Sequence, residues 1–210
     1  MLVEATVPRS PVMGKEEESE QETAIVRALV NKAKTGDVEA FEGLMILYQR
    51  RVLGIALRML GNPDDAKDAA QEVFLRLFKR LSSLDPARRI APWLYRVTIN
   101  VCHDVGRRRR ATAGVALNSR SMIPSSSWAA CDDIEGSLIL AEEWRFLQAG
   151  LAWLPKKERA SLVLRDVEGL DTAEVAKILG TSAVTIRTHL SRGRLRLIKY
   201  IKQMLGRHRS

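Results

Sequence analysis

Apolar residues recur every three or four positions through most of this chain, which is the spacing of one buried face of an α-helix. The pattern predicts one helix from residue 24 to Gly36, a second from Asp37 to Gly61, and a third from Asn62 to residue 81. No segment is rich in strand signals, so the pattern indicates an all-α fold. The positions predicted to face the core are Ile25, Leu29, Ala33, Phe41, Leu44, Tyr48, Val52, Ile55, Ala56, Met59, Ala66, Ala69, Ala70, Val73, Phe74, Leu77, Phe78 and Leu81.

Polar residues and glycines mark the ends of these helices. Asp37 can accept a hydrogen bond from a free amide at the start of the second helix. Asn62, followed by Pro63 and two acids, is a strong start signal for the third. Gly36 and Gly61 are expected to end the helices before them.

Residues 81 to 90 predict a loop from their serine, aspartate and proline content. A fourth helix is expected to open at Pro92. Gly106 costs about 1 kcal/mol relative to alanine inside a helix, so the fourth helix is expected to kink or end there. Its predicted inward residues are Leu94, Val97, Thr98, Val101, Cys102 and Val105.

Three segments lack the helical pattern. Residues 1–22 carry two prolines and five glutamates between Glu16 and Glu22, and predict a disordered acidic tail. Residues 111–137 are rich in serine, alanine and glycine, and predict a flexible linker. Residues 206–210 form a short basic tail. We therefore expect two small helical domains, at residues 23–110 and 138–205, joined by the linker.

The second domain is predicted to open with a helix from about Ser137, followed after Pro155 by a helix from Lys156 to about Val167. The inward positions of the two helices are Leu140, Trp144, Leu147, Leu151, Leu162, Val163 and Val167.

Residues 170–197 then predict a helix-turn-helix. Asp171 and Glu174 have the spacing of a capping box, in which each side chain bonds the backbone amide of the other. Gly180 can take the left-handed conformation that ends the first helix, and Ser182 can cap the second almost at once. In the second helix we expect Ile186, Leu190 and Leu197 to pack inward. The predicted outward face holds Ser182, Val184, Arg187, Thr188, Ser191, Arg192 and Arg194.

Composition narrows the class of partner. The chain has 210 residues, 34 Lys and Arg against 25 Asp and Glu, and a formal net charge of +9. A basic chain favours a polyanionic partner, of which nucleic acid is the commonest and a membrane surface the alternative. Two cysteines, Cys102 and Cys131, are too few for a disulfide framework or a zinc site, which favours the cytoplasm. No leader or membrane span is expected.

Basic residues gather on two helices. Between Ser182 and Ser210 there are eight Arg or Lys and no acid, on a helix with the outward face that a DNA major groove requires. The fourth helix carries a row that can stack on bases and hold phosphates, and ends in four arginines. The members of the row are Trp93, Arg96, Asn100, His103 and Arg107, and Arg108 follows.

The third helix carries the opposite charge. Asp65, Asp68, Gln71 and Glu72 lie on one of its faces. Such an acidic face can simply be solvated surface. In so basic a chain, it is also suited to contact with a basic surface on a partner protein.

Two stretches together carry a specific resemblance. NPDDAKDAAQEVFLRLFKRL with PWLYRVTINVCHDVGRRRR, and the segment LPKKERASLVLRDVEGLDTAEVAKILGTSAVTIRTHLSRGRLRL, resemble a bacterial RNA polymerase sigma factor of the extracytoplasmic-function (ECF) group. The resemblance covers about residues 24–110 and 138–203. It implies that the first domain is sigma domain 2 and the second sigma domain 4.

The resemblance also implies roles for residues. Asp68, Gln71 and Glu72 would dock on the clamp helices of the largest polymerase subunit. Residues 84–110 would recognise and open the minus-ten element, with Arg88, Trp93, Arg96, Asn100, Arg107 and Arg108 in contact with DNA. The helix from Ser182 would read the minus-thirty-five element, while its domain contacts the flap of the second-largest subunit. Such proteins are generally held inactive by an anti-sigma protein, so one is implied here.

Two alternatives remain open at the level of the sequence. A stand-alone helix-turn-helix regulator would share the basic faces but would not bind polymerase. A nuclease would need clustered carboxylates or histidines at metal-ligand spacing, and the sequence offers none. We therefore expect a protein without catalytic residues, metal or cofactor.

Overall fold

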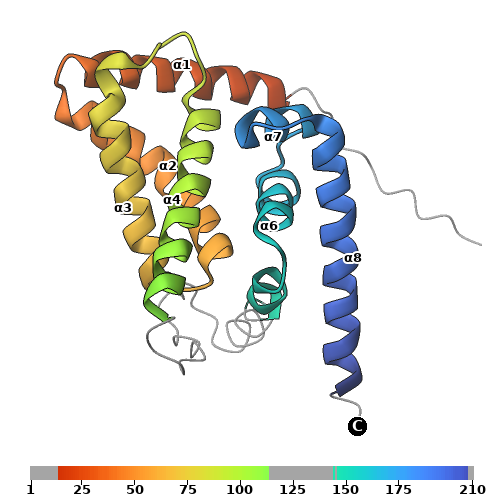
Figure 1. Cartoon of the computed structure of the whole chain (residues 1–210). Coiled ribbons are helices and arrows are strands. Elements are labelled where there is room, and N and C mark those ends of the chain that lie inside the picture. The colour runs from red at the N-terminus through yellow and green to blue at the C-terminus, as the bar shows by residue number, and fades with distance from the viewer. Residues whose placement is uncertain (1–13, 114–143, 145, 208–210) are drawn as a thin grey trace, which may run out of the picture.

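The computed structural model describes residues 14–113, 144 and 146–207, and all of its regular elements are helical. In chain order they are α1 (Gly14–Lys34), α2 (Val38–Leu60), α3 (Pro63–Arg80), the 3₁₀ turn η1 (Leu81–Ser83), α4 (Ile90–Ala113), a helical stretch at residues 146–152, α6 (Lys156–Leu162), the π-helical turn η2 (Val163–Val167), α7 (Thr172–Leu179) and α8 (Ala183–Arg207). Figure 1 shows α2, α3 and α4 grouped with α1 across one end, and α6 and α7 between that group and α8. The all-α prediction is confirmed.

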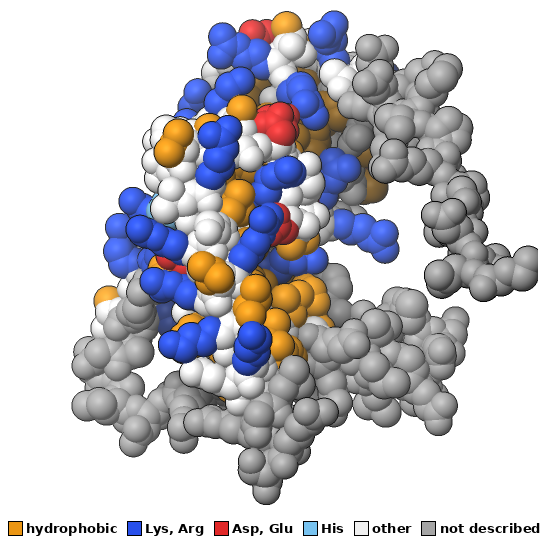
Figure 2. Space-filling view, turned by 90° about the vertical axis from the view of Figure 1, so that its right-hand side faces the viewer, with side chains coloured by type: hydrophobic (Ala, Val, Ile, Leu, Met, Phe, Trp, Pro, Cys, Tyr) orange, Lys and Arg blue, Asp and Glu red, His pale blue; other side chains and the backbone are white. Residues whose placement is uncertain are grey.

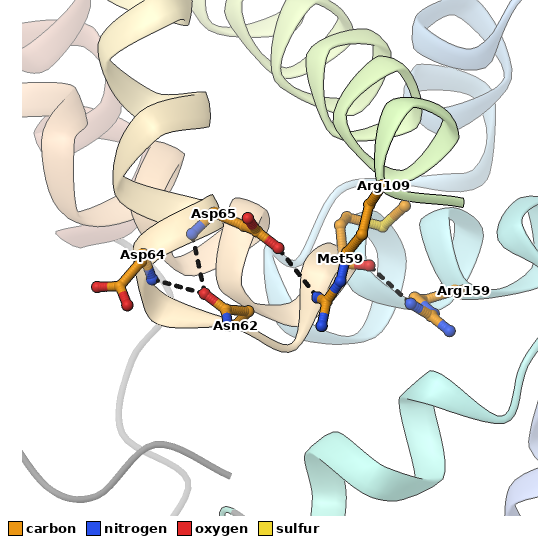
Figure 3. A network of polar contacts seen from close by, with 6 residues as sticks. All are labelled: Met59, Asn62, Asp64, Asp65, Arg109 and Arg159. Carbon is orange, nitrogen blue, oxygen red and sulfur yellow. Dashed lines mark hydrogen bonds and ion pairs between the residues drawn. The ribbon is translucent and has the colours of Figure 1, made fainter. Parts of the chain in front are cut away.

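The predicted starts of the second and third helices are correct. Asp37 accepts a hydrogen bond from the amide of Ala40 at 3.0 Å. Asn62 accepts from the amides of Asp64 and Asp65 at 2.8 and 2.9 Å (Figure 3). Gly61 takes the left-handed conformation, with φ 72°, and thereby closes α2. Each of these interactions is made within a few residues of the helix end that it sets.

The first-domain core lies between α2, α3 and α4. Leu44, Val52, Ile55, Val73, Leu77 and Leu94 are fully buried there, as the pattern predicted. Two predicted core positions are wrong: Ile25 is 55% exposed and Phe78 is 61% exposed. On α1 the buried residues are the predicted Ala33 and, in addition, Val26 and Val30, because these positions face α2.

The boundaries of the first domain also differ from the prediction. Helix α1 begins at Gly14, so residues 14–22 are helical and not a disordered tail, while residues 1–13 lie outside the described part. Helix α4 begins at Ile90, before Pro92, and continues through Gly106 to Ala113 without ending there. One glycine is tolerated because the rest of α4 packs on α2 and α3. The predicted linker therefore begins inside α4 at residues 111–113, and from residue 114 onward it lies outside the described residues.

The helix-turn-helix follows the prediction closely. Asp171 accepts from the Glu174 amide at 2.7 Å and Glu174 accepts from the Asp171 amide at 3.1 Å, which completes the capping box. Gly180 has φ 64° and ends α7. Ser182 accepts from the Thr185 amide at 3.1 Å and starts α8. Ile186 and Leu190 are buried, and Leu197 is partly buried.

Two inward positions of the second domain are wrong. Leu147 is 41% exposed and Val167 is 45% exposed. The predicted helix to Val167 changes to a π turn after Leu162, with the Glu168 amide bonding the Val163 carbonyl at 3.0 Å. This wider turn rotates the side chain of Val167 away from the core. The predicted start near Ser137 and Leu140 lies outside the described residues, as do residues 208–210 of the predicted tail, while α8 extends to Arg207.

Candidate nucleic-acid interface

Helix α8 presents the predicted DNA-reading face to solvent. Val184, Arg187, Thr188, Ser191, Arg192 and Arg194 are all exposed, opposite the buried Ile186 and Leu190. Figure 2 shows this side of the molecule, where Lys and Arg side chains lie over the upper part and hydrophobic side chains gather lower down. The hydroxyl of Thr188 donates to the Val184 carbonyl at 3.1 Å, and Ser182 caps the helix. These two side chains therefore make local bonds as well as facing outward.

Arg194 is held by an acid of its own domain. Its Nε and Nη2 donate to the two carboxylate oxygens of Asp166 at 3.1 and 2.6 Å. This hydrogen bond to Asp166 raises the pKa of Arg194. Further along α8, Arg196 lies 3.4 Å from the buried Glu158. Two of the basic residues on α8 are thus oriented by carboxylates before any ligand arrives.

A groove beside α8 brings several predicted residues together. Arg187, Ser191 and Arg194 line it from α8, and Arg165 and Thr172 line it from the elements before. Arg165 also donates to the Leu170 carbonyl at 2.9 Å, which fixes the chain between η2 and α7. Three guanidinium groups make this groove basic, and Asp166 already takes the paired donors of Arg194, the geometry through which arginine also binds phosphate.

Helix α4 carries the second predicted face. Arg96, Asn100, Arg107 and Arg108 are exposed along it. Trp93 is only partly exposed, packs on the core, and lies 6.0 Å from the guanidinium of Arg80. Arg107 pairs with Asp104 on the preceding turn at 3.0 Å. The residues of the predicted row therefore lie on one helix. Trp93 takes part in the core packing, and the exposed cations follow it along α4.

The arginine run at the end of α4 is not entirely directed at solvent. Arg109 donates to Asp65 at the start of α3, at 3.0 Å (Figure 3). One of the four arginines that end this helix is therefore paired within its own domain, at the start of α3. Spacing along the sequence gives no signal for a pair whose members are 44 residues apart.

The loop before α4 holds Arg88 beside a small pocket. This pocket lies between α1, Tyr48 of α2 and residues 86–91. Arg88 is exposed and lies 3.4 Å from Asp85, whose side chain also accepts from the Ala87 amide at 3.0 Å. Arg89, which the sequence did not single out, pairs with Glu174 of the second domain at 3.4 Å.

The acidic face of α3 is open to solvent at Asp68 and Gln71, while Glu72 is partly covered. Arg76 donates to Glu72 at 2.8 Å, and this bond lowers the pKa of the Glu72 carboxyl. The same side of α3 continues into exposed apolar residues, Leu75 and Phe78. Phe78 meets Phe41 of α2 edge to face, with 5.3 Å between ring centroids. A mixed acidic and apolar face is suited to a protein partner.

The remaining chemistry-bearing groups are few. Burial raises the pKa of the Cys102 thiol to about 12. Among the described residues, no group of three His, Cys, Asp or Glu side chains is placed to hold a metal ion. Within the same residues, no helix combines the length and the apolar character needed to cross a membrane.

The comparisons with known proteins match both domains of the chain to the same family. Residues 44–112 match the family model of sigma-70 region 2, and residues 147–197 match that of sigma-70 region 4, together more than half of the chain. The ECF RNA polymerase sigma factor SigW of Bacillus subtilis is 27% identical over 192 residues, which cover 86% of this chain and 98% of SigW. SigE of Mycolicibacterium smegmatis, another ECF sigma factor, is 34% identical over 171 residues, 80% of this chain and 65% of SigE.

A solved structure extends the likeness to the fold. CnrH in complex with the cytosolic domain of CnrY aligns with a TM-score of 0.63 and 25% identity, over 85% of this chain and 98% of CnrH. Two helical domains in this order, the second with a helix-turn-helix, define a transcription initiation factor of the sigma class. The chain belongs to the ECF group of the sigma-70 family.

Proposed function

We propose that this protein is a promoter-specificity subunit, which binds core RNA polymerase, directs it to promoters and helps to open the DNA. The observation that carries the proposal is the presence of two basic faces on α4 and α8, one in each domain, with an acidic face on α3. A stand-alone regulator explains the basic faces but not the acidic and apolar surface of α3.

The docking role falls to the face of α3. Asp68, Gln71 and Glu72 are assigned to the clamp helices of the largest polymerase subunit, as in the family. The Arg76 bond holds Glu72 ionised to lower pH and in one orientation, ready to face a basic partner.

Recognition of the minus-ten element is assigned to α4 and the loop before it. Arg88, Arg96, Asn100, Arg107 and Arg108 would follow the non-template strand, and Trp93 would support that face from the core. Melting then needs no bond chemistry, because binding energy from flipped bases and phosphates offsets the loss of base pairing.

Recognition of the minus-thirty-five element is assigned to α8. Arg187 and Ser191 face the groove that Arg194 shares. The second helix of a helix-turn-helix can enter the major groove with its N-terminal residues on base edges. The same domain would contact the flap of the second-largest polymerase subunit.

The partners follow from the assignment. CnrH was solved bound to the cytosolic domain of CnrY, and a second protein of similar fold, RpoE of Bartonella quintana, was solved bound to the anti-sigma factor NepR. We infer a similar anti-sigma partner here, action in the cytoplasm beside polymerase, and no catalytic activity of the chain itself.

In vitro transcription with core polymerase and a random promoter library tests the proposal. The protein should enrich templates that carry two conserved elements at a fixed spacing. Charge reversal at Asp68 and Glu72 should abolish both core binding and transcription. If this variant keeps both, the assignment of the α3 face is wrong, and if the unaltered protein never binds core polymerase, a stand-alone regulator replaces the proposal.

A further inference from the structure

The hydroxyl groups at the start of α8 are bonded within the helix itself. The Ser182 hydroxyl accepts from the Thr185 amide at 3.1 Å, and the hydroxyl oxygens of these two residues lie 2.8 Å apart, at hydrogen-bond distance. The hydroxyl of Thr188 donates to the Val184 carbonyl at 3.1 Å. Because its proton is used inside α8, the part of Thr188 that is left for a partner is mainly its methyl group.

Val184 lies one turn before Thr188 on the same outward face. Its side chain is 67% exposed, whereas Ile186, two residues later, is fully buried. Residues four apart are neighbours on a helix surface, and a valine has one strongly preferred rotamer there, so its two methyl groups are held in place. Val184 and Thr188 thus form a small apolar surface, which we call the methyl face. Arg187 is exposed beside it, three residues after Val184.

The residue types on this helix limit which bases it can read. In the major groove, Asn and Gln pair with adenine, Asp and Glu accept from the amino group of cytosine, and Arg bonds guanine through two donors. Residues 182–194 include no Asn, Gln, Asp or Glu. The apolar contact that remains is with the C5-methyl group of thymine, which is the one methyl group that the bases expose in the groove. The leading turns of α8 are therefore chemically suited to guanine and thymine.

We infer that the methyl face reads the C5-methyl group of one thymine in the minus-thirty-five element, close to a guanine that Arg187 bonds. The inference rests on the proposed function, since it names the bases that the same surface of α8 selects. Side chains three apart on a helix have Cβ atoms about 5–6 Å apart, and base pairs follow each other roughly every 3.4 Å, so the two bases lie within about two base pairs of each other. Removing one methyl group from water is worth about three- to five-fold in affinity.

Uracil tests this contact, because it pairs as thymine does and lacks only the C5-methyl group. Core polymerase carrying the full chain first selects promoters from a random double-stranded library, and the upstream element is the one whose selection changes with Arg187→Ala. The best promoter is then remade with uracil in place of each thymine of that element in turn, on either strand, and affinities are measured by competition. At one thymine, uracil should weaken binding about three- to five-fold.

Variants of the methyl face then assign the contact. Val184→Ala should lose most of the difference between the thymine and uracil promoters, and should keep the preference for guanine. Thr188→Ser keeps the bond to the Val184 carbonyl and removes one methyl group, so it should reduce the thymine preference. The control is Val38→Ala, the same change at a valine that is 68% exposed in the first turn of α2, and it should keep the thymine preference of the wild type. Circular dichroism at 222 nm verifies that helix content is equal in all of them.

Each other outcome has a defined meaning. If the wild type binds every uracil promoter as tightly as its thymine form, or if Val184→Ala keeps the full difference, the methyl reading is wrong while the proposed function stands. A loss of the difference in Val38→Ala also overturns the methyl reading. If the chain never binds core polymerase, the library is selected with the chain alone. A thymine preference that Val184→Ala removes then supports the methyl reading and overturns only the proposed function, whereas equal binding of both forms overturns both.

Discussion

Two glycines offer a matched pair of substitutions with opposite expected effects. Gly180 ends α7 at φ 64°, and the nearest atom to an added Cβ is the Arg96 Nη2 at 3.8 Å, an ordinary contact. Gly106 lies inside α4 without a positive φ, and an added Cβ there meets nothing within 4 Å. Neither substitution by alanine creates a clash. The difference between them isolates the backbone conformation.

The magnitudes follow from that difference. An L-residue in the left-handed conformation costs about 1–2 kcal/mol, so Gly180→Ala should destabilise the second domain by about that amount. In a helix interior alanine is better than glycine by roughly 0.5–1 kcal/mol, so Gly106→Ala should stabilise the first domain. At about 2–4 °C per kcal/mol for a chain of this length, the two melting temperatures should differ by several degrees.

Differential scanning calorimetry of the full chain measures both effects. If the domains melt separately, each substitution should move only the transition of its own domain. If both substitutions raise the melting temperature, or both lower it, the reasoning is refuted, because the backbone conformation of the glycine would then not determine whether alanine stabilises or destabilises the domain. Leu or Asn at position 180 extends the test, since asparagine tolerates the left-handed conformation and leucine does not.

Three other expectations can be tested directly. Ile186→Ala removes a fully buried side chain beneath the helix-turn-helix and should lower the free energy of unfolding by about 2–5 kcal/mol in chemical denaturation. In a Cys131→Ser background, the buried Cys102 thiol should react with an alkylating reagent only as the chain unfolds. Burial raises the pKa of this thiol from 9.0 to about 12. Its contribution to the free energy of unfolding is therefore complete below pH 9 and is lost as the pH rises toward 12. Arg187→Ala should cost about 1–3 kcal/mol at one base pair of the promoter if it reads a base edge, and uniform weakening across a mutated promoter set would assign it to phosphate instead.

Local signals predicted the ends of helices well. Asp37, Asn62, the Asp171–Glu174 box, Gly180 and Ser182 all act within a few residues of their own positions. Their bonds depend on the backbone conformation at one turn, so the sequence around them suffices. The outward face of α8 was predictable for a related reason, since Ile186 and Leu190 fix which side of the helix is buried.

Positions that depend on neighbouring elements were harder to predict. Residues 14–22 contain few apolar residues and predicted disorder, yet they continue a helix whose later turns pack on α2. Val167 kept the helical spacing, but the π turn shifts its direction by a fraction of a turn. The helical period alone cannot show where one extra residue enters a turn.

Contacts between distant segments gave no signal in the sequence. Arg159 reaches Met59 across 100 positions, and Arg89 reaches Glu174 across 85. Each arginine looks like an ordinary surface cation when read along the chain. Their pairing depends on how the two domains dock, which single-sequence patterns do not encode. The DNA and polymerase roles of the predicted residues stay predictions until binding is measured.

The length of α8 has a mechanical consequence. Its 25 residues span about 37 Å, whereas a major groove is about 12 Å wide, so only the leading turns can enter the groove. Gly193, near the middle of α8, lies close against α6, where a Cβ would come within 2.8 Å of a Leu162 methyl group. Beyond it, Tyr200 packs against Phe146 and Trp153, so the second half of α8 anchors the helix that carries Arg187 to its own domain.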